Sequence, residues 1–167
     1  MTFHPSDPNK LIFLDVDGVL NDHRVNPVSL SGYIKPACMK RLNRIIRRTH
    51  ARIVISSAWR YMIHGGSMNI DGFSYMLRTH GLSCDALIVG ITCSDEQVQT
   101  RPEQIALYLE PYPSANYVVL DDLSPLNRDW SILKNVILTD GTQGLTDTDA
   151  KKAIHLLNGV PNADDKR

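Results

Sequence analysis

The sequence has few cysteines, no excess of charge and no long apolar run, and each absence argues against a class of protein. Its 3 cysteines, Cys38, Cys84 and Cys93, form no Cys-x-x-Cys pair, which argues against a disulfide framework or a zinc knuckle. The 18 Lys and Arg balance the 18 Asp and Glu, so no global charge attracts nucleic acid or an anionic membrane. Apolar runs such as residues 11–14 are too short to span a bilayer, and the N-terminus lacks the pattern of a secretory signal. We therefore expect a reduced, cytoplasmic protein with no membrane partner.

The composition is that of an ordinary globular domain, with 43% hydrophobic and 22% charged residues. A chain of 167 residues is long enough to bury one sizeable core. No internal repeat and no Gly/Ser-rich or Pro-rich linker divides it. We predict a single domain over residues 1–158, followed by a polar tail at residues 159–167.

Short apolar or β-branched runs alternate with longer amphipathic segments along the chain. The runs predict five strands, at residues 10–15, 52–56, 86–90, 117–121 and 135–139. The amphipathic segments predict four helices, at residues 36–49, 71–80, 102–109 and 146–157. Pro36 and Thr146 are typical of helix starts, and Gly81 is typical of a helix stop. This alternation indicates an α/β protein with a parallel sheet covered by helices on both faces.

Polar side chains follow three of the predicted strands at the point where each strand ends. The segments are Asp15-Val16-Asp17-Gly18, Ser56-Ser57 and Asp121-Asp122. Taken singly, the two acidic segments are more typical of an ordinary turn or helix cap than of a functional site, and Ser56 could simply end its strand. Together they would meet at one sheet edge, because parallel strands have their carboxyl ends at the same edge. This edge is where ligands of parallel sheets bind.

Four carboxylates gathered at one edge would repel each other unless a cation lay among them. Oxygen ligands favour a hard ion, and Mg²⁺ typically binds one or two carboxylates while leaving room for a substrate phosphate. Gly18 would let the backbone turn away and approach a ligand closely. The pattern therefore predicts a Mg²⁺ site that serves a phosphorylated substrate.

These segments resemble, in the same order, the four motifs of the haloacid dehalogenase (HAD) superfamily of phosphohydrolases. The matching positions are residues 11–20, 53–56, 101 and 118–122. Arg101 stands where lysine is more frequent, and Val19 stands where many members have threonine. The acid at Asp17 favours a phosphatase, because the dehalogenases of the superfamily lack a carboxylate there and its transport ATPases carry threonine.

The chain is more specifically similar to the small HAD domains of Swiss Army Knife RNA-repair proteins. This similarity rests on residues 17–21, 56–60, 119–122, 139–140 and 144–146. It implies a three-layer, Rossmann-like fold with strand order 3-2-1-4-5. Residues 22–55 and 60–86 leave room for little more than one helix each, so the fold is expected to be capless or to carry a minimal cap.

The resemblance implies hydrolysis of a phosphomonoester through an aspartyl-phosphate on Asp15. Asp17 would act as general acid and base, and Ser56, or Ser57 in its place, would hydrogen-bond a phosphoryl oxygen. Arg101 would neutralise charge on the transferred group.

Further positions are candidates to bind the metal or the substrate. The expected metal ligands are Asp15, the main-chain carbonyl of Asp17, and Asp121 or Asp122, with the direct ligand of this last pair left open. The expected substrate contacts are Gly18, Asn21, Ser57 and Arg60.

The nature of the substrate has several interpretations. The resemblance favours nucleic-acid or nucleotide phosphate ends, and the alternatives are a phosphatase of small metabolites or nucleotides and a non-catalytic phosphate-binding module.

Basic residues gather around the first predicted helix, at Lys35, Lys40, Arg41, Arg44, Arg47, Arg48 and Arg52. They form either a solvated surface or a track for a phosphate backbone. The oligomeric state is left open.

Overall fold

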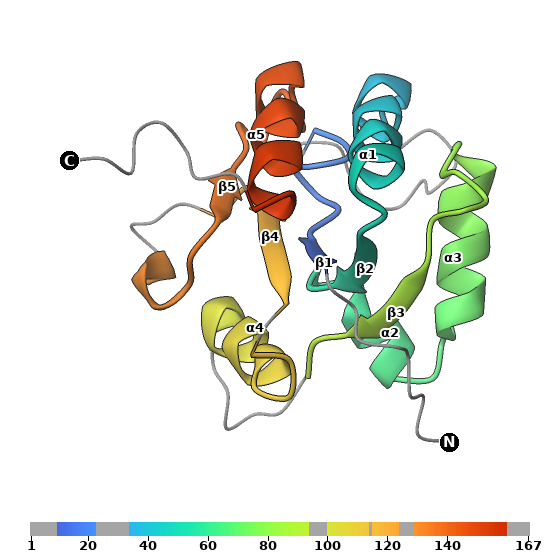
Figure 1. Cartoon of the computed structure of the whole chain (residues 1–167). Coiled ribbons are helices and arrows are strands. Elements are labelled where there is room, and N and C mark those ends of the chain that lie inside the picture. Colours follow the sequence, from blue (N-terminus) through green and yellow to red (C-terminus); the bar gives the residue numbers. More distant parts are fainter. Residues whose placement is uncertain (1–9, 23–33, 94–99, 114, 124–128, 160–167) are drawn as a thin grey trace.

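The computed structural model describes residues 10–22, 34–93, 100–113, 115–123 and 129–159, and these contain a five-stranded sheet (Figure 1). The strands are β1 (Lys10–Leu14), β2 (Arg52–Ile55), β3 (Ile88–Ile91), β4 (Asn116–Asp121) and β5 (Val136–Leu138). All neighbouring pairs are parallel, and the order is β3-β2-β1-β4-β5. The predicted fold class and strand order are confirmed.

Helices cover both faces of the sheet. They are α1 (Pro36–Thr49), α2 (Arg60–His64), α3 (Ile70–Thr79), α4 (Arg101–Leu109) and α5 (Asp147–Leu157), with a 3₁₀ helix, η2 (Trp130–Ile132). Helices α1, α3 and α5 contribute buried residues to one hydrophobic core, whereas α4 and η2 contribute to the core on the opposite face. No helix within the described residues is both long and apolar enough to cross a membrane.

The two faces are set by the alternation of side chains along each strand. On β1, Ile12 and Leu14 belong to the core under α1, α3 and α5, and Leu11 and Phe13 belong to the core under α4. By the same alternation, Asp15 follows on the α4 side of the sheet. The polar residues that end the strands are thereby directed toward α4.

Most helix ends lie where the sequence predicts them. Thr146 caps α5 in a capping box with Asp149, and Pro36 is the first residue of α1. Thr100 caps α4 in a second capping box with Glu103, and the helix therefore begins at Arg101.

Two short elements differ from the prediction. The helix α2 and the 3₁₀ helix η2 were not predicted, because neither is long enough to show a helical period in the sequence. The third strand ends one residue later than expected, and its register shifts between Ile53 and Val54 of β2. Of the predicted polar tail, residues 160–167 lie outside the described residues.

Candidate active site

The polar residues that end the strands form a row across one edge of the sheet. Leu14 pairs with Ile55 on one side and with Leu120 on the other, so the residues that follow are also neighbours. The ladder continues past the strands, because Asp15 N donates to Leu120 O over 2.9 Å and Ser56 N donates to Leu14 O over 3.1 Å. Asp15, Ser56 and Asp121 therefore lie side by side, and all three are buried.

Arg101 contacts two of these residues from the face of the sheet that α4 covers. Its Nη1 atom donates to Asp15 Oδ2 over 2.5 Å and to Asp121 Oδ2 over 2.6 Å. The capping box at Thr100 fixes the start of α4, and this start places Arg101 over the row. Burial alone would lower the pKa of Arg101, but the negative charges of Asp15 and Asp121 raise it overall. The residue matched to the third motif is thus brought to the carboxylates that follow β1 and end β4.

Asp121 is a buried carboxyl whose ionisation is opposed by its surroundings. Burial and the nearby charge of Asp15 raise the pKa of Asp121 to about 6, and Arg101 opposes this shift. Its second oxygen, Oδ1, accepts a hydrogen bond from Leu123 N over 2.9 Å. The carboxyl therefore has a fixed orientation and a cost of ionisation that a further cation would relieve.

The carboxylates at this edge fit a divalent cation. Asp15, Asp121 and Asp122 each present an oxygen, and these oxygens lie within 4.8 Å of one another. Gly18 has a φ of +75°, and a Cβ atom there would lie 2.1 Å from Asp122 Oδ2, so glycine is needed for both conformation and space. Oxygen donors with one arginine beside them leave excess negative charge, which suits a hard ion such as Mg²⁺.

Asp17 lies apart from this cluster and is held by two donors. Asn21 Nδ2 donates to Asp17 Oδ1 and Trp59 Nε1 donates to Asp17 Oδ2, each over 2.9 Å. Asn21 also accepts a hydrogen bond from Gly18 N over 2.8 Å, so one side chain fixes the turn that carries both residues. Trp59 was not among the predicted site residues, although it lies in the segment after the second motif that supported the resemblance.

The two candidate serines have different surroundings. Ser56 Oγ is buried and has no hydrogen-bond partner, whereas Ser57 Oγ accepts a hydrogen bond from Trp59 N over 3.3 Å. Thr92, the first residue after β3, extends the row beyond Ser56 and also has a buried hydroxyl without a partner. Burying an unpaired hydroxyl is costly, so these groups indicate a polar ligand at the edge of the sheet. Sequence reasoning missed Thr92.

Arg60 lies beneath the loop that carries the serines. Its Nη1 atom donates to the carbonyls of Ser56 and Ser57, each over 2.9 Å, and its Nη2 atom donates to Gln104 Oε1 on α4 over 2.8 Å. Burial lowers the pKa of Arg60. In this position the guanidinium shapes the loop from within the protein, and its predicted contact with substrate stays a prediction.

The loop between β5 and α5 supports the turn around Gly18. Thr139 Oγ1 donates to Gly18 O over 2.8 Å, and Leu145 N donates to Val19 O over 2.7 Å. At Gly144, with a φ of +75°, a Cβ atom would lie 2.8 Å from Val19 O. Thr139, Gly144 and Leu145, which lie in segments that carry the similarity to the Swiss Army Knife domains, thus pack against this turn.

Comparison with known families agrees with this geometry. Residues 11–150 match the family described as the HAD domain in Swiss Army Knife RNA repair proteins. The match spans the five strands and the whole row of polar residues. No curated protein matches the chain. Since the family match covers most of the sequence, the chain belongs to the HAD-domain family of Swiss Army Knife RNA repair proteins.

Proposed function

We propose that the protein is a Mg²⁺-dependent phosphomonoester hydrolase that acts through an aspartyl-phosphate on Asp15. The observation that carries the proposal is the position of Asp15, between the unpartnered hydroxyl of Ser56 and the guanidinium of Arg101. Membership of a HAD-domain family supports a phosphohydrolase. The two flanking groups supply the donors that a phosphoryl group beside Asp15 would need.

In the first step, a carboxylate oxygen of Asp15 attacks the phosphorus, and the bond from phosphorus to the ester oxygen breaks. Asp17 gives its proton to the departing oxygen. Both oxygens of Asp17 already accept a hydrogen bond, and each carboxyl oxygen has a second lone pair that can hold the proton. Asn21 and Trp59 thereby fix the direction in which that proton is given.

In the second step, water attacks the phosphorus of the aspartyl-phosphate and passes a proton to Asp17. The bond between phosphorus and the Asp15 oxygen breaks, which releases inorganic phosphate and restores both carboxyl groups. Ser56 and Arg101 donate hydrogen bonds to the phosphoryl oxygens in both steps.

The residues that would hold the metal are Asp15, the Asp17 main-chain carbonyl, and Asp121 or Asp122. The chemistry that bound Mg²⁺ supplies is compensation of charge between a phosphate dianion and the carboxylates around it. Asp121 is suited to this cation, because burial opposes its ionisation and a bound positive charge would favour the ionised carboxylate.

The preferred substrate is a phosphorylated end of a nucleic acid or nucleotide. This preference rests on the family, whose description names RNA repair. A phosphatase of small metabolites would use the same residues and differ only in what binds beyond the phosphate. A non-catalytic phosphate-binding module is the other alternative, and it would not require the two donors that orient Asp17.

Hydrolysis of an aryl phosphate tests the chemistry without assuming the natural substrate. We expect turnover that requires Mg²⁺, is abolished by a chelator, and falls by at least about a thousandfold in Asp15→Asn. Asp85→Asn is the matched control, since this exposed carboxylate lies outside the site. Turnover that survives in Asp15→Asn contradicts the proposal.

A second measurement covers a protein that rejects aryl phosphates. Beryllium fluoride mimics a phosphoryl group on aspartate, and it should raise the melting temperature of the wild type and of Asp85→Asn, but not of Asp15→Asn. If beryllium fluoride has no effect and no phosphorylated nucleotide or oligonucleotide is hydrolysed, the protein is a non-catalytic module.

A further inference from the structure

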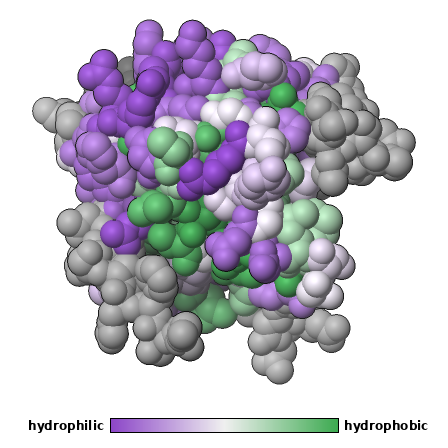
Figure 2. Space-filling view, turned by 90° about the vertical axis from the view of Figure 1, so that its right-hand side faces the viewer, coloured by the Kyte–Doolittle hydropathy of each residue, from purple (hydrophilic) through white to green (hydrophobic). Residues whose placement is uncertain are grey.

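One surface of α1 carries positive charge in a protein with no net charge. The helix contains five basic residues and no acidic one, within the sequence PACMKRLNRIIRRT. Four of them form one stripe, here called the α1 basic face: the neighbours Lys40 and Arg41, followed at spacings of three or four positions by Arg44 and Arg47. In Figure 2, hydrophilic residues cover the upper part of the molecule, at the height of α1 and α5 in Figure 1.

The α1 basic face borders a hollow of about 330 Å³. The residues that line it are Ala37, Lys40, Arg41, Arg44, Arg47 and Asp147. Four cations and one carboxylate leave an excess of three positive charges in this space. Such an excess favours an anionic ligand over a neutral one.

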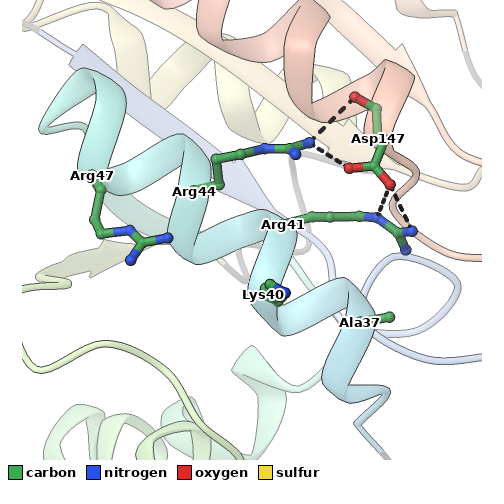
Figure 3. A pocket seen from close by; sticks show the side chains of 6 residues that line it. All are labelled: Ala37, Lys40, Arg41, Arg44, Arg47 and Asp147. Carbon is green, nitrogen blue, oxygen red and sulfur yellow. Dashed lines mark hydrogen bonds and ion pairs between the residues drawn. The ribbon is translucent and has the colours of Figure 1, made fainter.

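A single carboxylate serves two of the four cations. Arg41 Nη2 lies 2.8 Å from Asp147 Oδ2, and Arg44 Nη2 lies 2.8 Å from Asp147 Oδ1 (Figure 3). Lys40 and Arg47 are exposed, and neither forms an ion pair within the described part of the chain. The contacts to Asp147 explain how α5 is tied to α1, but they leave most of the positive charge available.

One end of the α1 basic face lies near the turn after β1, which carries Asp17 and Gly18. Arg41 Nη1 donates to Leu145 O over 3.2 Å, and Leu145 N donates to Val19 O over 2.7 Å, two residues beyond Asp17. From Lys40 to Arg47 the stripe extends about 10 Å along the helix, at the usual rise per residue. The N-terminal end of the α1 basic face therefore lies at the edge of the sheet where the turn after β1 lies, and Lys35 N also donates to Leu20 O of that turn over 2.8 Å. Since Asp15 faces the α4 side and α1 covers the other side, a strand bound at Asp15 would cross this edge to reach α1.

We propose that the α1 basic face binds the sugar-phosphate backbone of a nucleic-acid strand whose phosphorylated end lies at Asp15. This inference rests on the proposed function, and it names the part of the substrate that lies beyond the reacting phosphate. A row of cations fits a row of phosphates, whereas a mononucleotide would use only one end of it.

A membrane surface is a poorer match for the same charge. The exposed positions of α1 are Pro36, Ala37, Lys40, Arg47 and Arg48. None of these is a large apolar or aromatic residue, which interfacial helices insert among lipids. The chemistry of the exposed positions thus favours nucleic acid.

The decisive variant reverses the two cations that make no ion pair, in Lys40→Glu with Arg47→Glu. The matched control, Lys134→Glu with Lys152→Glu, changes the net charge by the same amount at two exposed positions away from α1, one between η2 and β5 and one on α5. Binding is measured by fluorescence anisotropy with a labelled single strand of about twelve nucleotides that has no terminal phosphate. This probe reports on α1 alone, because it offers nothing to hydrolyse.

We expect the α1 variant to bind the strand at least about tenfold more weakly than the wild type, with the control within about twofold. Across about 50 to about 200 mM salt, loss of two phosphate contacts should reduce the slope of log affinity against log salt by about 1.4. Asp147→Asn should tighten binding, because it removes the only carboxylate among the described residues that line the hollow.

Activity then separates this inference from the proposed function. The α1 variant should hydrolyse an aryl phosphate within about twofold of the wild type and a phosphate-ended oligonucleotide about tenfold less efficiently. Equal weakening of strand binding in both double variants overturns the inference, as does binding to vesicles of anionic lipid without binding to the strand. If the wild type hydrolyses neither the aryl phosphate nor the oligonucleotide, this result counts against the proposed function. Binding of the unphosphorylated strand still tests the inference about α1.

Discussion

The indole Nε1 of Trp59 donates a hydrogen bond to Oδ2 of Asp17 over 2.9 Å. The donor comes from the segment after β2 and the acceptor from the turn after β1, so two motifs of the family meet in one contact. Trp59 is buried, and its ring packs edge-to-face on Phe73 of α3 with ring centroids 6.0 Å apart. The short helices after β2 thereby help to hold the candidate acid and base.

Replacing Trp59 by phenylalanine should impair catalysis more than stability. Phenylalanine keeps an aromatic ring against Phe73 but removes the donor to Asp17, so the carboxyl is held by Asn21 alone. We expect Trp59→Phe to lower kcat about tenfold to a hundredfold with little change in KM, since proton transfer by a positioned group contributes about a hundredfold or more. Kinetics with an aryl phosphate and the melting temperature check this expectation. An unchanged kcat would show that Asn21 is sufficient to orient Asp17.

Lysine should replace Arg101 far better than a neutral side chain does. A single nitrogen of Arg101 contacts both Asp15 and Asp121, so one ammonium group can provide the same contacts. We expect Arg101→Lys to retain kcat within about tenfold and Arg101→Gln to lose about a hundredfold to a thousandfold. Steady-state kinetics of the two variants decide the matter. Equal activity in the two variants would show that the charge of Arg101 has no role in catalysis.

Alanine at Gly18 should weaken metal binding specifically. A Cβ atom there would lie 2.1 Å from Oδ2 and 2.7 Å from Cβ of Asp122, so the whole Asp122 side chain must move. We expect Gly18→Ala to raise the Mg²⁺ concentration for half-maximal activity by at least about tenfold, the loss typical of disturbed metal surroundings.

Gly66 provides the control for backbone strain. It has a φ of +74°, close to that of Gly18, but a Cβ atom there meets nothing within 4 Å. Gly66→Ala therefore carries the same cost of a left-handed backbone, about 1 kcal/mol, without the clash. A Mg²⁺ requirement that rises equally in both variants would mean that strain alone is responsible.

Much of this site could be predicted from the sequence because its residues follow buried strands. The positions of Asp15, Ser56 and Asp121 depend on strand ends and on parallel pairing, and both are visible as apolar runs with a polar residue after them. Arg101 was harder to place, because its position depends on where α4 begins. The capping pair Thr100 and Glu103 determines that start, and a helix start is poorly defined by periodicity alone.

The remaining contacts could not be read from local sequence. The contact of Trp59 with Asp17 spans 42 positions, and the contact of Thr139 with Gly18 spans 121. Arg60 was predicted to contact the substrate, and that contact stays a prediction; the structure adds that Arg60 is buried and donates to main-chain carbonyls of the loop before it. An arginine after a strand looks the same in sequence whether it points outward or into the protein. Only contacts made in the fold, such as the hydrogen bond from Arg60 to Gln104 on α4, distinguish the two.

The attachment of α1 to α5 should depend on pH through Asp147. Hydrogen bonds from Arg41 and Arg44 lower the pKa of Asp147 below its usual value. A lowered pKa contributes stability above the unfolded pKa of an aspartate, about 3.9, and that contribution is lost as the pH falls through the folded value. Asp147→Asn should therefore lower the melting temperature at pH 7 by at most about 2 °C, because exposed ion pairs are weak, and the difference should be smaller at about pH 3, below the unfolded pKa, than at pH 7. Asp71→Asn is the control, since Asp71 lies in the first turn of α3 with no ion pair among the described residues. A difference between the wild type and Asp147→Asn that is the same at both pH values would exclude the charge of Asp147 as its cause.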